Sequence, residues 1–417
     1  MLRACVNFCA ARSVFGALAC ALAAILSPQA ALAQPAAAAQ EDLLTLRLSR
    51  TPNWDTNVLR VVDEVSDPQL ARGISGKSDR FIVDTVGLHF SKSYAQQSVL
   101  FDIDQTSTRY DKFSFLNRDA LNYRAAWQWH LTPRISGTLS ADQAGSVVGF
   151  DDTQVQTLTT TVTRNRNLSI DAWLFGGWHL LAGTARSERK TSQLFLAVPS
   201  SDQVMADFGL RYDTASRGSI TVTRRRSRGV TEGQDVDRVN FIDNVFTLTE
   251  TDLRATWVTS GKSTLTAHLG RVERRHDNIP QRDFSAIAGD ATFAWTPTSK
   301  LSVNLSATRV IAPFTTGTSA TYRADDTLAF VPAWQASEKI RLNMRASRRT
   351  STFLGPVVPV VGPPRRDVLG SVLFGADWTA HPKVTLRATL QRDRRTSTDA
   401  TLFFNDRVAT FSVSLTY

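Results

Sequence analysis

The stretch "FAWTPTSKLSVNLS", from Phe293 to Ser306, decides the fold. From residue 301 onward every second side chain is apolar, and the side chains between them are serine or asparagine. Alternation with a period of two is typical of a β-strand that has one apolar and one polar face. The preceding run ends on an aromatic pair, Phe293 and Trp295, shortly before a "TPTSK" turn. The stretch therefore predicts two strands joined by a tight turn, with a tryptophan near that turn.

The same phrase recurs along the chain as "QWHLTPRISGTLS" (128–140), "PAWQASEKIRLNMRAS" (332–347) and "ADWTAHPKVTLRATL" (376–390). Aromatic residues stand at the ends of the predicted strands, at spacings of 34 to 49 residues. They are Phe90, Trp129, Trp178, Tyr212, Trp257, Trp295, Trp334, Trp378 and Tyr417. Each interval has room for two strands of about ten or more residues, one tight turn and one longer loop. The repeat therefore predicts a chain of consecutive hairpins.

Counting the runs gives eighteen strands, an even number as in bacterial barrels, and sixteen is the alternative. The expected strands are 42–50, 80–92, 96–110, 118–131, 134–146, 162–177, 180–192, 202–213, 218–228, 246–259, 263–274, 284–297, 299–311, 320–335, 339–350, 367–380, 383–396 and 404–417. Two all-β folds suit this pattern. A soluble sandwich packs the apolar faces together, whereas a membrane barrel turns them toward lipid.

Three features favour a transmembrane, antiparallel, up-and-down β-barrel. The strands are long and numerous, and the aromatic residues stand where an interfacial girdle would lie. The chain stops on "TFSVSLTY", which resembles the C-terminal signal of bacterial outer-membrane barrels. A closed barrel also leaves no unpaired sheet edge in hydrocarbon. Beyond the first residues there is no run of 18 apolar side chains, so a helical membrane bundle is excluded.

The first 33 residues differ from the rest of the chain. Arg3 and Arg12 precede the short apolar run "VFGALACALAAIL" (14–26), and Ala31-Leu32-Ala33 is a suitable cleavage site. This pattern predicts a signal peptide over 1–33, because the apolar core is too short for a membrane anchor. A short periplasmic segment (34–41) and the barrel (42–417) would follow. We therefore expect the mature protein in the outer membrane.

Charge and cysteine content limit the range of possible functions and partners. All three cysteines lie in the predicted leader, which leaves the mature chain no disulfide, no cysteine metal site and no thiol chemistry. The net charge of the full chain is +10, and the leader holds two of the arginines and no acid. A basic excess suits anionic lipid, an acidic polymer or nucleic acid. Export makes a nucleic-acid partner improbable, so outer-membrane lipid and lipopolysaccharide are the expected neighbours.

The barrel also has a predicted orientation. If the last strand ends on the periplasmic side, a girdle of aromatic side chains marks that interface, because an amphipathic ring favours this level. The girdle consists of Trp129, Trp178, Trp257, Trp295, Trp334, Trp378 and Tyr417. The short turns then face the periplasm and the longer segments face outward, with 51–79 the longest.

With the apolar face outward, the polar partners line the lumen. The candidates for a substrate path are Asp102, Asp104, Arg124, Arg211, Arg254, Arg323, Arg341, Arg345 and Arg387, and the same parity places Asp84 in the lumen. A polar channel that binds sugars or anions and a solvated wall without specificity both remain open. Asp102 and Asp104 share a face, but cross-strand ion pairs are a more ordinary use for them than acid–base chemistry.

Further arginines cluster at the ends of strands that approach the outer side. Half of each cluster faces outward by parity, and Arg224, Arg348, Arg392 and Arg394 are expected to contact lipid headgroups. The alternative is that they guard the mouth of the pore. The apolar, proline-rich segment "TFLGPVVPVVGPPRR" (352–366) either folds over the mouth, contacts a partner or forms a stiff surface loop.

The chain shows no catalytic pattern. Its six histidines are scattered, and neither H-E-x-x-H, G-x-S-x-G nor a phosphate-binding loop occurs. The sequence therefore predicts no enzyme, no cofactor and no metal site.

Two stretches go beyond a generic barrel. "NWDTNVLR" (53–60) and "RYDKFSFLNRDALNYRAAWQWHL" (109–131) resemble segments of the exosortase-associated exopolysaccharide-biosynthesis outer-membrane proteins of the EpsL type. The first match is looser, because Trp54, Thr56 and Val58 depart from the pattern. The resemblance implies a role in exporting a secreted polysaccharide from a Gram-negative cell, with other components of an export apparatus as partners. It brings no catalytic residues.

Three functions remain open at this level. The barrel is a channel for polysaccharide export, a general diffusion porin, or a structural or adhesive barrel whose loops bind partners.

Overall fold

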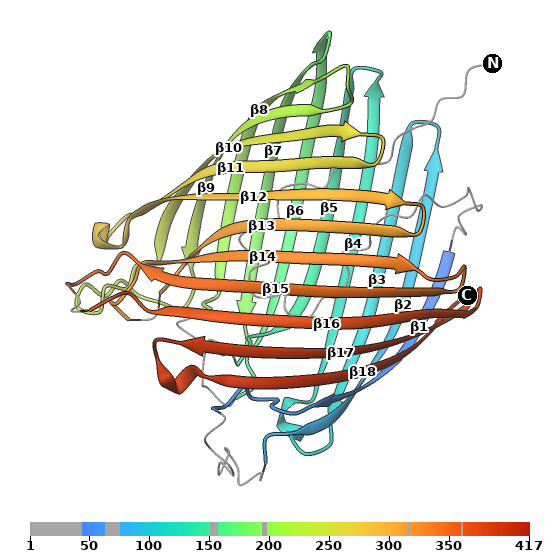
Figure 1. Ribbon diagram of the computed structural model, residues 1–417. Helices are drawn as coiled ribbons and strands as arrows, with labels where there is room; N and C mark the ends of the chain where they lie inside the picture. Colours follow the sequence, from blue (N-terminus) through green and yellow to red (C-terminus); the bar gives the residue numbers. More distant parts are fainter. Residues whose placement is uncertain (1–43, 63–75, 151–156, 194–197, 316, 360–361) are drawn as a thin grey trace.

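The molecule is one sheet of eighteen antiparallel strands (Figure 1). The computed structural model describes residues 44–62, 76–150, 157–193, 198–315, 317–359 and 362–417. The strands are β1 (Leu44–Asp55), β2 (Asp79–Tyr94), β3 (Gln97–Tyr110), β4 (Arg118–Thr132), β5 (Ile135–Val147), β6 (Thr160–Phe175), β7 (Trp178–Thr191), β8 (Ser201–Asp213), β9 (Ser219–Thr231), β10 (Val245–Ser260), β11 (Ser263–His276), β12 (Phe284–Thr298), β13 (Leu301–Pro313), β14 (Tyr322–Gln335), β15 (Ile340–Leu354), β16 (Arg366–His381), β17 (Val384–Ser397) and β18 (Phe404–Thr416). Three short 3-10 turns, η3 (Ser114–Leu116), η4 (Pro280–Arg282) and η5 (Ala400–Leu402), lie in the connections.

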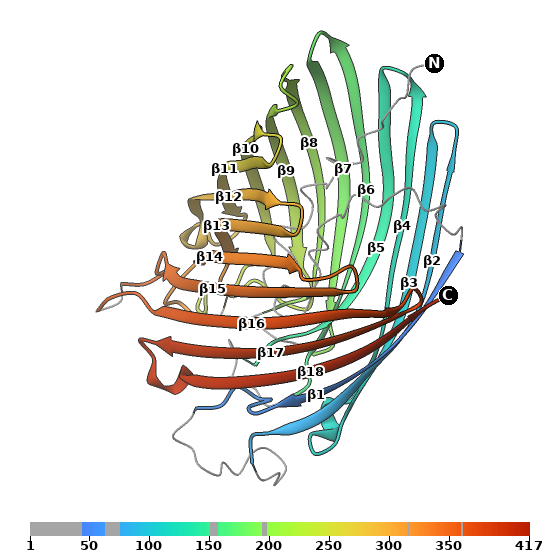
Figure 2. The same cartoon turned by 45° about the vertical axis from the view of Figure 1, so that its right-hand side comes forward.

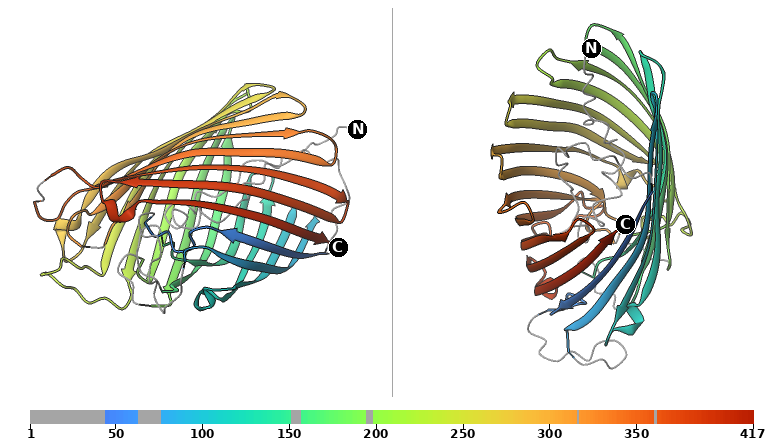
Figure 3. Two further views of the ribbon diagram at one scale, coloured as in Figure 1. Left: turned by 60° about the horizontal axis from the view of Figure 1, so that its bottom comes forward. Right: turned by 90° about the vertical axis from the view of Figure 1, so that its right-hand side faces the viewer.

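The sheet closes into a ring. Each strand pairs with its neighbours in sequence, and β18 pairs with β1. At this seam the N–H of Leu46 donates to the carbonyl of Tyr417 (2.7 Å), and the N–H of Tyr417 donates to the carbonyl of Leu46 (2.9 Å). Figure 2 shows the blue first strand beside the red last one, and Figure 3 shows the sheet curving back on itself. The predicted eighteen-stranded barrel is confirmed, and the sixteen-stranded alternative is wrong.

The outer face is apolar and uncovered. Leu269, Leu328 and Leu390 face outward and keep 59%, 64% and 66% of their surface exposed. In water each would forgo about 1.5–3 kcal/mol of burial free energy. In the described part of the chain every strand belongs to this one sheet, so no second sheet covers them. A continuous exposed apolar band is what a barrel presents to lipid, and the soluble sandwich is excluded.

The two rims differ in the length of their connections. Turns of two residues (95–96, 133–134, 176–177, 261–262, 299–300 and 382–383) join strands on the rim that holds the C-terminus. The opposite rim carries the longer segments, of which 56–78 is the longest. This asymmetry matches the predicted short turns on one rim and longer loops on the other, and the assignment of the short-turn rim to the periplasm stays a prediction. No helix among the described residues is long and apolar enough to cross a membrane.

Two predicted details are wrong. The first strand was expected to end at residue 50, but β1 continues to Asp55, because its partners β2 and β18 are long enough to pair with it there. Asp84 faces outward rather than into the lumen, since it lies opposite Arg50, with the two side chains 3.7 Å apart. The predicted signal peptide (1–33) and the segment 34–41 lie outside the described residues.

The proline-rich segment begins as part of β15, which reaches Leu354. The ring of Phe353 is buried; it packs edge-on against Phe314 (5.0 Å between centroids) and lies under the guanidinium of Arg365 (4.3 Å). Beyond the strand, the N–H of Val357 donates to the carbonyl of Thr318 (2.9 Å). The described part of the segment is therefore tied to the neighbouring loop at the same rim.

The motif "NWDTNVLR" clasps the seam between β1 and β18. Arg60 places Nη1 3.1 Å from Asp55 and 2.9 Å from the fully buried carboxylate of Asp406. Asn57 donates to the carbonyl of Asn405 (3.2 Å). The hydroxyl of Thr56 donates to Asp406 (3.0 Å). The contacts with Asn405 and Asp406 join residues that are some 350 positions apart in sequence, so the motif has a clear structural role in closing the barrel.

Candidate functional site

The interior wall is the candidate site, and the register of the strands defines it. Residues that lie opposite each other on neighbouring strands point to the same face of the sheet. The chain of partners starts at Arg47, which lies opposite Gly87, and continues through His89 opposite Asp102 and Asp102 opposite Arg124. Followed around the ring, it places all nine predicted lumen residues on the inner face. They are Asp102, Asp104, Arg124, Arg211, Arg254, Arg323, Arg341, Arg345 and Arg387. Their role in a substrate path stays a prediction.

The first charged cluster joins β1, β2 and β3. Arg47 Nη2 donates to Asp102 (3.0 Å) and Asp104 (3.3 Å), and His89 Nδ1 lies 2.6 Å from Asp102. Gly87 makes this possible, because a Cβ at that position would collide with the Asp104 carboxylate. A cavity of about 260 Å³ is lined by Arg47 and the two aspartates, together with Arg124 on β4. The arginine and the two aspartates keep 42%, 22% and 34% of their side chains exposed, so they are wet as well as paired.

A second cluster lies near the short-turn ends of β6, β7 and β8. Arg211 contacts Asp171 (2.7 Å) and Asp213 (3.0 Å), and His179 contacts the same two carboxylates (2.7 and 3.4 Å). One arginine and one histidine thus bridge two aspartates. Such a network holds its members in fixed positions, because each one is anchored from two sides.

A third cluster joins β10, β11 and β12. His268 uses both ring nitrogens, with Nε2 2.9 Å from Asp252 and Nδ1 3.1 Å from Asp290. Both aspartates face inward, as the alternation of their strands predicts, whereas the six histidines show no pattern in the sequence. In each of the three clusters a histidine lies beside at least one carboxylate of a neighbouring strand. The alternation of each strand indicates that these histidines face inward, whereas their carboxylate partners depend on the exact register of the neighbouring strands.

Some inward arginines carry charge that the wall does not neutralise. Among the described residues, Arg124, Arg254, Arg341 and Arg345 take part in no ion pair, whereas Arg387 contacts Asp377. Arg341, Arg345 and Arg349 follow one another at every fourth residue of β15 on the inner face. Guanidinium groups presented in such a row can bind carboxylate, phosphate or sulfate groups in turn.

Arg323 is a poorer candidate than the sequence suggested. It faces inward, but it is buried and contacts the buried Asp325 (3.0 Å) near the loop-bearing rim. A few strands away Arg395 contacts Asp367 (2.7 Å), again with both side chains buried. Breaking such a pair would leave a buried charge without a partner, so these residues stabilise the rim. They are therefore not free to contact a passing solute.

The predicted girdle faces outward along the short-turn rim. Trp178, Trp257, Trp295, Trp334, Trp378 and Tyr417 are exposed, and Trp129 is half-buried. Trp127, which the sequence analysis missed, also faces outward, and its indole N–H donates to Gln97 (2.8 Å). The contact of these rings with a membrane interface stays a prediction.

The four arginines expected at lipid headgroups lie on the outer face. Arg224, Arg348, Arg392 and Arg394 are exposed, on β9, β15 and β17. Their contact with lipid is likewise a prediction. No group of three or more histidine, aspartate or glutamate side chains in the described residues could hold a metal ion.

A closed antiparallel barrel with an apolar outside and a charged inside is the fold of outer-membrane porins. Three solved structures illustrate the likeness. A BenF-like porin from Pseudomonas fluorescens Pf-5 matches with a TM-score of 0.51 at 12% identity, over 90% of this chain and 99% of that one. OccK9 (OpdG) of Pseudomonas aeruginosa matches at 0.51 and 11%, over 90% and 98%. OpdK of the same species, solved with vanillate, matches at 0.50 and 11%, over 90% and 99%. At such identities the likeness concerns the fold alone.

No protein-family model matches the sequence, and no curated protein matches it either.

Proposed function

We propose that this protein forms a water-filled channel in the outer membrane of a Gram-negative cell, and that the channel assists export of an extracellular polysaccharide. The observation that supports a channel is the composition of the inner wall. Nearly every strand of the closed ring places charged groups there, and many of these groups are half-exposed. A barrel of about this size can leave an aqueous path. A dry interior would not tolerate so many charges.

The role in exporting a polysaccharide is supported by the resemblance of "NWDTNVLR" and of residues 109–131 to polysaccharide-export barrels. The clusters around Arg47, Arg211 and His268 suit this role, because they offer fixed donors and acceptors to hydroxyl-rich sugars. In this proposal the longer loops face the cell exterior, other export components meet the periplasmic rim, and residues 1–33 are removed on export.

A general diffusion porin is the second candidate. Arg341 and Arg345 favour it, because neither is in an ion pair with a described residue, and such guanidinium groups attract small anions regardless of any polymer. The likeness to the BenF-like porin points the same way. A structural or adhesive barrel is a third candidate, which requires a closed pore.

Planar-bilayer recording separates these functions. An export channel should conduct, and the polysaccharide isolated from the same cells should block it reversibly, whereas an unrelated neutral dextran of equal length should not. A diffusion porin should conduct without selective block, and a structural barrel should give no conductance. Deletion of the gene should leave polymer inside the cell; normal surface polymer in the deletion strain would reject the export role.

A further inference from the structure

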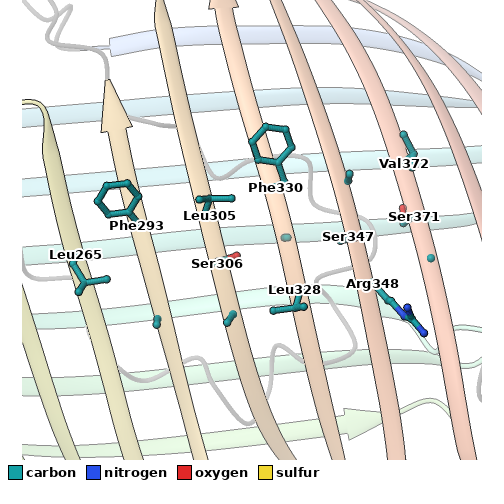
Figure 4. A pocket seen from close by; sticks show the side chains of 15 residues that line it. Leu265, Phe293, Leu305, Ser306, Leu328, Phe330, Ser347, Arg348, Ser371 and Val372 are labelled. Atoms are coloured by element: carbon teal, nitrogen blue, oxygen red, sulfur yellow. The ribbon is translucent and has the colours of Figure 1, made fainter. Parts of the chain in front are cut away.

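The outer wall bears a shallow apolar groove that the channel function does not explain. It has a volume of about 700 Å³ and crosses β11 to β16 (Figure 4). Its sides carry Leu265, Phe293, Leu305, Leu328 and Phe330, which Figure 4 shows on successive strands. Its floor is made of small residues, namely Ala291, Ala307, Ala346 and Gly370. Above Gly370 the space is open, because an added Cβ would meet no atom closer than 3.9 Å.

Arginines gather at the end of this groove. In the ladder, Arg348 lies opposite Gly370, which in turn lies opposite Arg394. Two residues further along β17, Arg392 lies directly opposite Arg407 of β18, and all four arginines are exposed. β15 and β18 are three strand spacings of about 4.8 Å apart, or about 14 Å, so the four long side chains form one patch on the outer face.

These four arginines lack the partners that others on the outer face have. Arg50, Arg109, Arg186 and Arg309 contact outward-facing aspartates at 3.7, 2.8, 2.5 and 3.5 Å. In the part of the chain that the structure describes, no carboxylate lies within ion-pair distance of Arg348, Arg392, Arg394 or Arg407. Like charges opposite each other in a ladder destabilise it, so this cluster favours an anion from outside the chain.

The position of the cluster along the barrel fits an outer-leaflet headgroup. Leu386 lies opposite the girdle residue Trp378, and Arg392 and Arg394 follow six and eight residues later on β17. That separation is about 20–27 Å along the strand, or about 15–22 Å in height at the usual tilt of such barrels. An apolar band is about 25 Å tall, so the groove lies within the hydrocarbon and the arginines near its far boundary.

We propose that this face binds one molecule of the bisphosphorylated, multiply acylated glycolipid of the outer leaflet, the lipid A part of lipopolysaccharide. Its phosphates lie among Arg348, Arg392, Arg394 and Arg407, and an acyl chain lies in the groove over Gly370. The ligand needs two chemistries side by side, anionic oxygens and a long apolar chain, and the wall supplies both. The proposal rests on the outer-membrane location proposed above, but not on what the pore conducts.

The test uses the full-length barrel refolded in phospholipid nanodiscs, with purified bisphosphorylated lipid A as the probe. Native mass spectrometry counts the bound lipid, and dephosphorylated lipid A serves as the ligand control. We expect about one tightly held lipid A per barrel. A triple variant, R348A/R392A/R394A, should weaken retention by roughly tenfold or more, because several charge-assisted contacts are lost together. Gly370→Leu should weaken it by filling the groove.

Arg226→Ala is the matched control, because Arg226 is also outward and exposed but lies on β9, away from the groove. It should leave retention unchanged. Heat-modifiable electrophoretic mobility verifies that each variant has closed its barrel. Equal loss in R226A, retention unchanged in the triple variant, or equal binding of dephosphorylated lipid A would each overturn the proposal. Conductance of the triple variant should match that of the wild type, so a failure here is distinct from a failure of the channel function.

Discussion

His268 shows how much can depend on one residue of the inner wall. Its ring holds Asp252 and Asp290, which lie on the strands to either side, and all three groups are at least partly buried. Replacing it by alanine removes the donor for both carboxylates at once. An unsatisfied buried polar group costs about 1–3 kcal/mol, and more when it is charged.

We therefore expect His268→Ala to lower the free energy of unfolding by about 1–3 kcal/mol. His381→Ala should change it by less than about 0.5 kcal/mol, because that residue is exposed at the short-turn rim. Urea titration in lipid vesicles, followed by tryptophan fluorescence, measures both values. Equal effects of the two changes would argue that the bridge contributes nothing.

Asp243 is a second residue whose role can be tested, outside the membrane-spanning strands. Burial alone would raise its pKa, but hydrogen bonds hold the pKa of this carboxyl below its usual range. The donors are the side chain of Asn278 (3.0 Å) and the backbone N–H groups of Val245 (3.1 Å), Asn278 (2.7 Å) and Ile279 (2.8 Å). Asp243 thereby ties segment 232–244 to segment 277–283.

The depressed pKa fixes the direction of the pH dependence. The tether contributes its full stability above the unfolded-state pKa of about 3.9, and it weakens as the pH falls through the lower folded-state value. The hydrogen-exchange protection factor of the Ile279 amide should therefore be constant from pH 7 to 5 and fall in stronger acid. Asp243→Asn should remove most of that acid dependence. A protection factor that falls between pH 7 and 5 would contradict the assignment.

At the scale of elements, β15 presents two kinds of arginine on its two faces. Arg345 points into the barrel and Arg348 points out, and neither is in an ion pair with a described residue. If the lumen conducts, Arg345→Glu should reverse or strongly reduce a preference for anions. Arg348→Glu should leave it unchanged. Reversal potentials under a salt gradient measure the preference, and an equal shift for both variants would show that their charges are not separated by the wall.

The pairing of β1 with β18 is stabilised by the ion pairs of Arg60 with Asp55 and Asp406. Burial would lower the pKa of its guanidinium, but the carboxylates of Asp55 and Asp406 outweigh burial and raise that pKa, so the residue stays charged. Arg60→Ala leaves two carboxylates facing each other without a cation. We expect a loss of about 3–5 kcal/mol, as for other broken buried pairs.

Arg60→Lys is the matched control, and it should recover part of the loss. Proteolysis of the vesicle-embedded barrel and urea unfolding both measure the effect. If Arg60→Ala unfolds like the wild type, the motif does not hold the seam closed.

The elements also show what the sequence can and cannot predict. Alternation predicted the face of each lumen arginine, because a period of two is the same whatever the neighbouring strand does. It failed at Asp84, whose partner is Arg50 on the outer face, because the three consecutive apolar residues 81–83 just before it interrupt the alternation. The histidine bridges were missed since a partner depends on register, which a one-residue slip would change. Residues 51–55 were assigned to a connecting segment, because only pairing with β2 and β18 makes them a strand.

For the molecule as a whole, a membrane barrel requires that apolar side chains contact lipid on the outside and that charged side chains contact water inside the closed ring. The three cysteines all lie within residues 1–33, so the barrel strands offer a background free of native thiols. Single cysteines can therefore be placed at consecutive positions of β15 as Met344→Cys, Arg345→Cys, Ala346→Cys and Ser347→Cys.

The most direct measurement is the reaction of these four cysteines with a small, charged, membrane-impermeant maleimide in vesicles. The inward positions 345 and 347 should be labelled, and the outward positions 344 and 346 should be protected by lipid until detergent is added. Labelling at all four positions, or at 344 and 346 alone, would contradict the account.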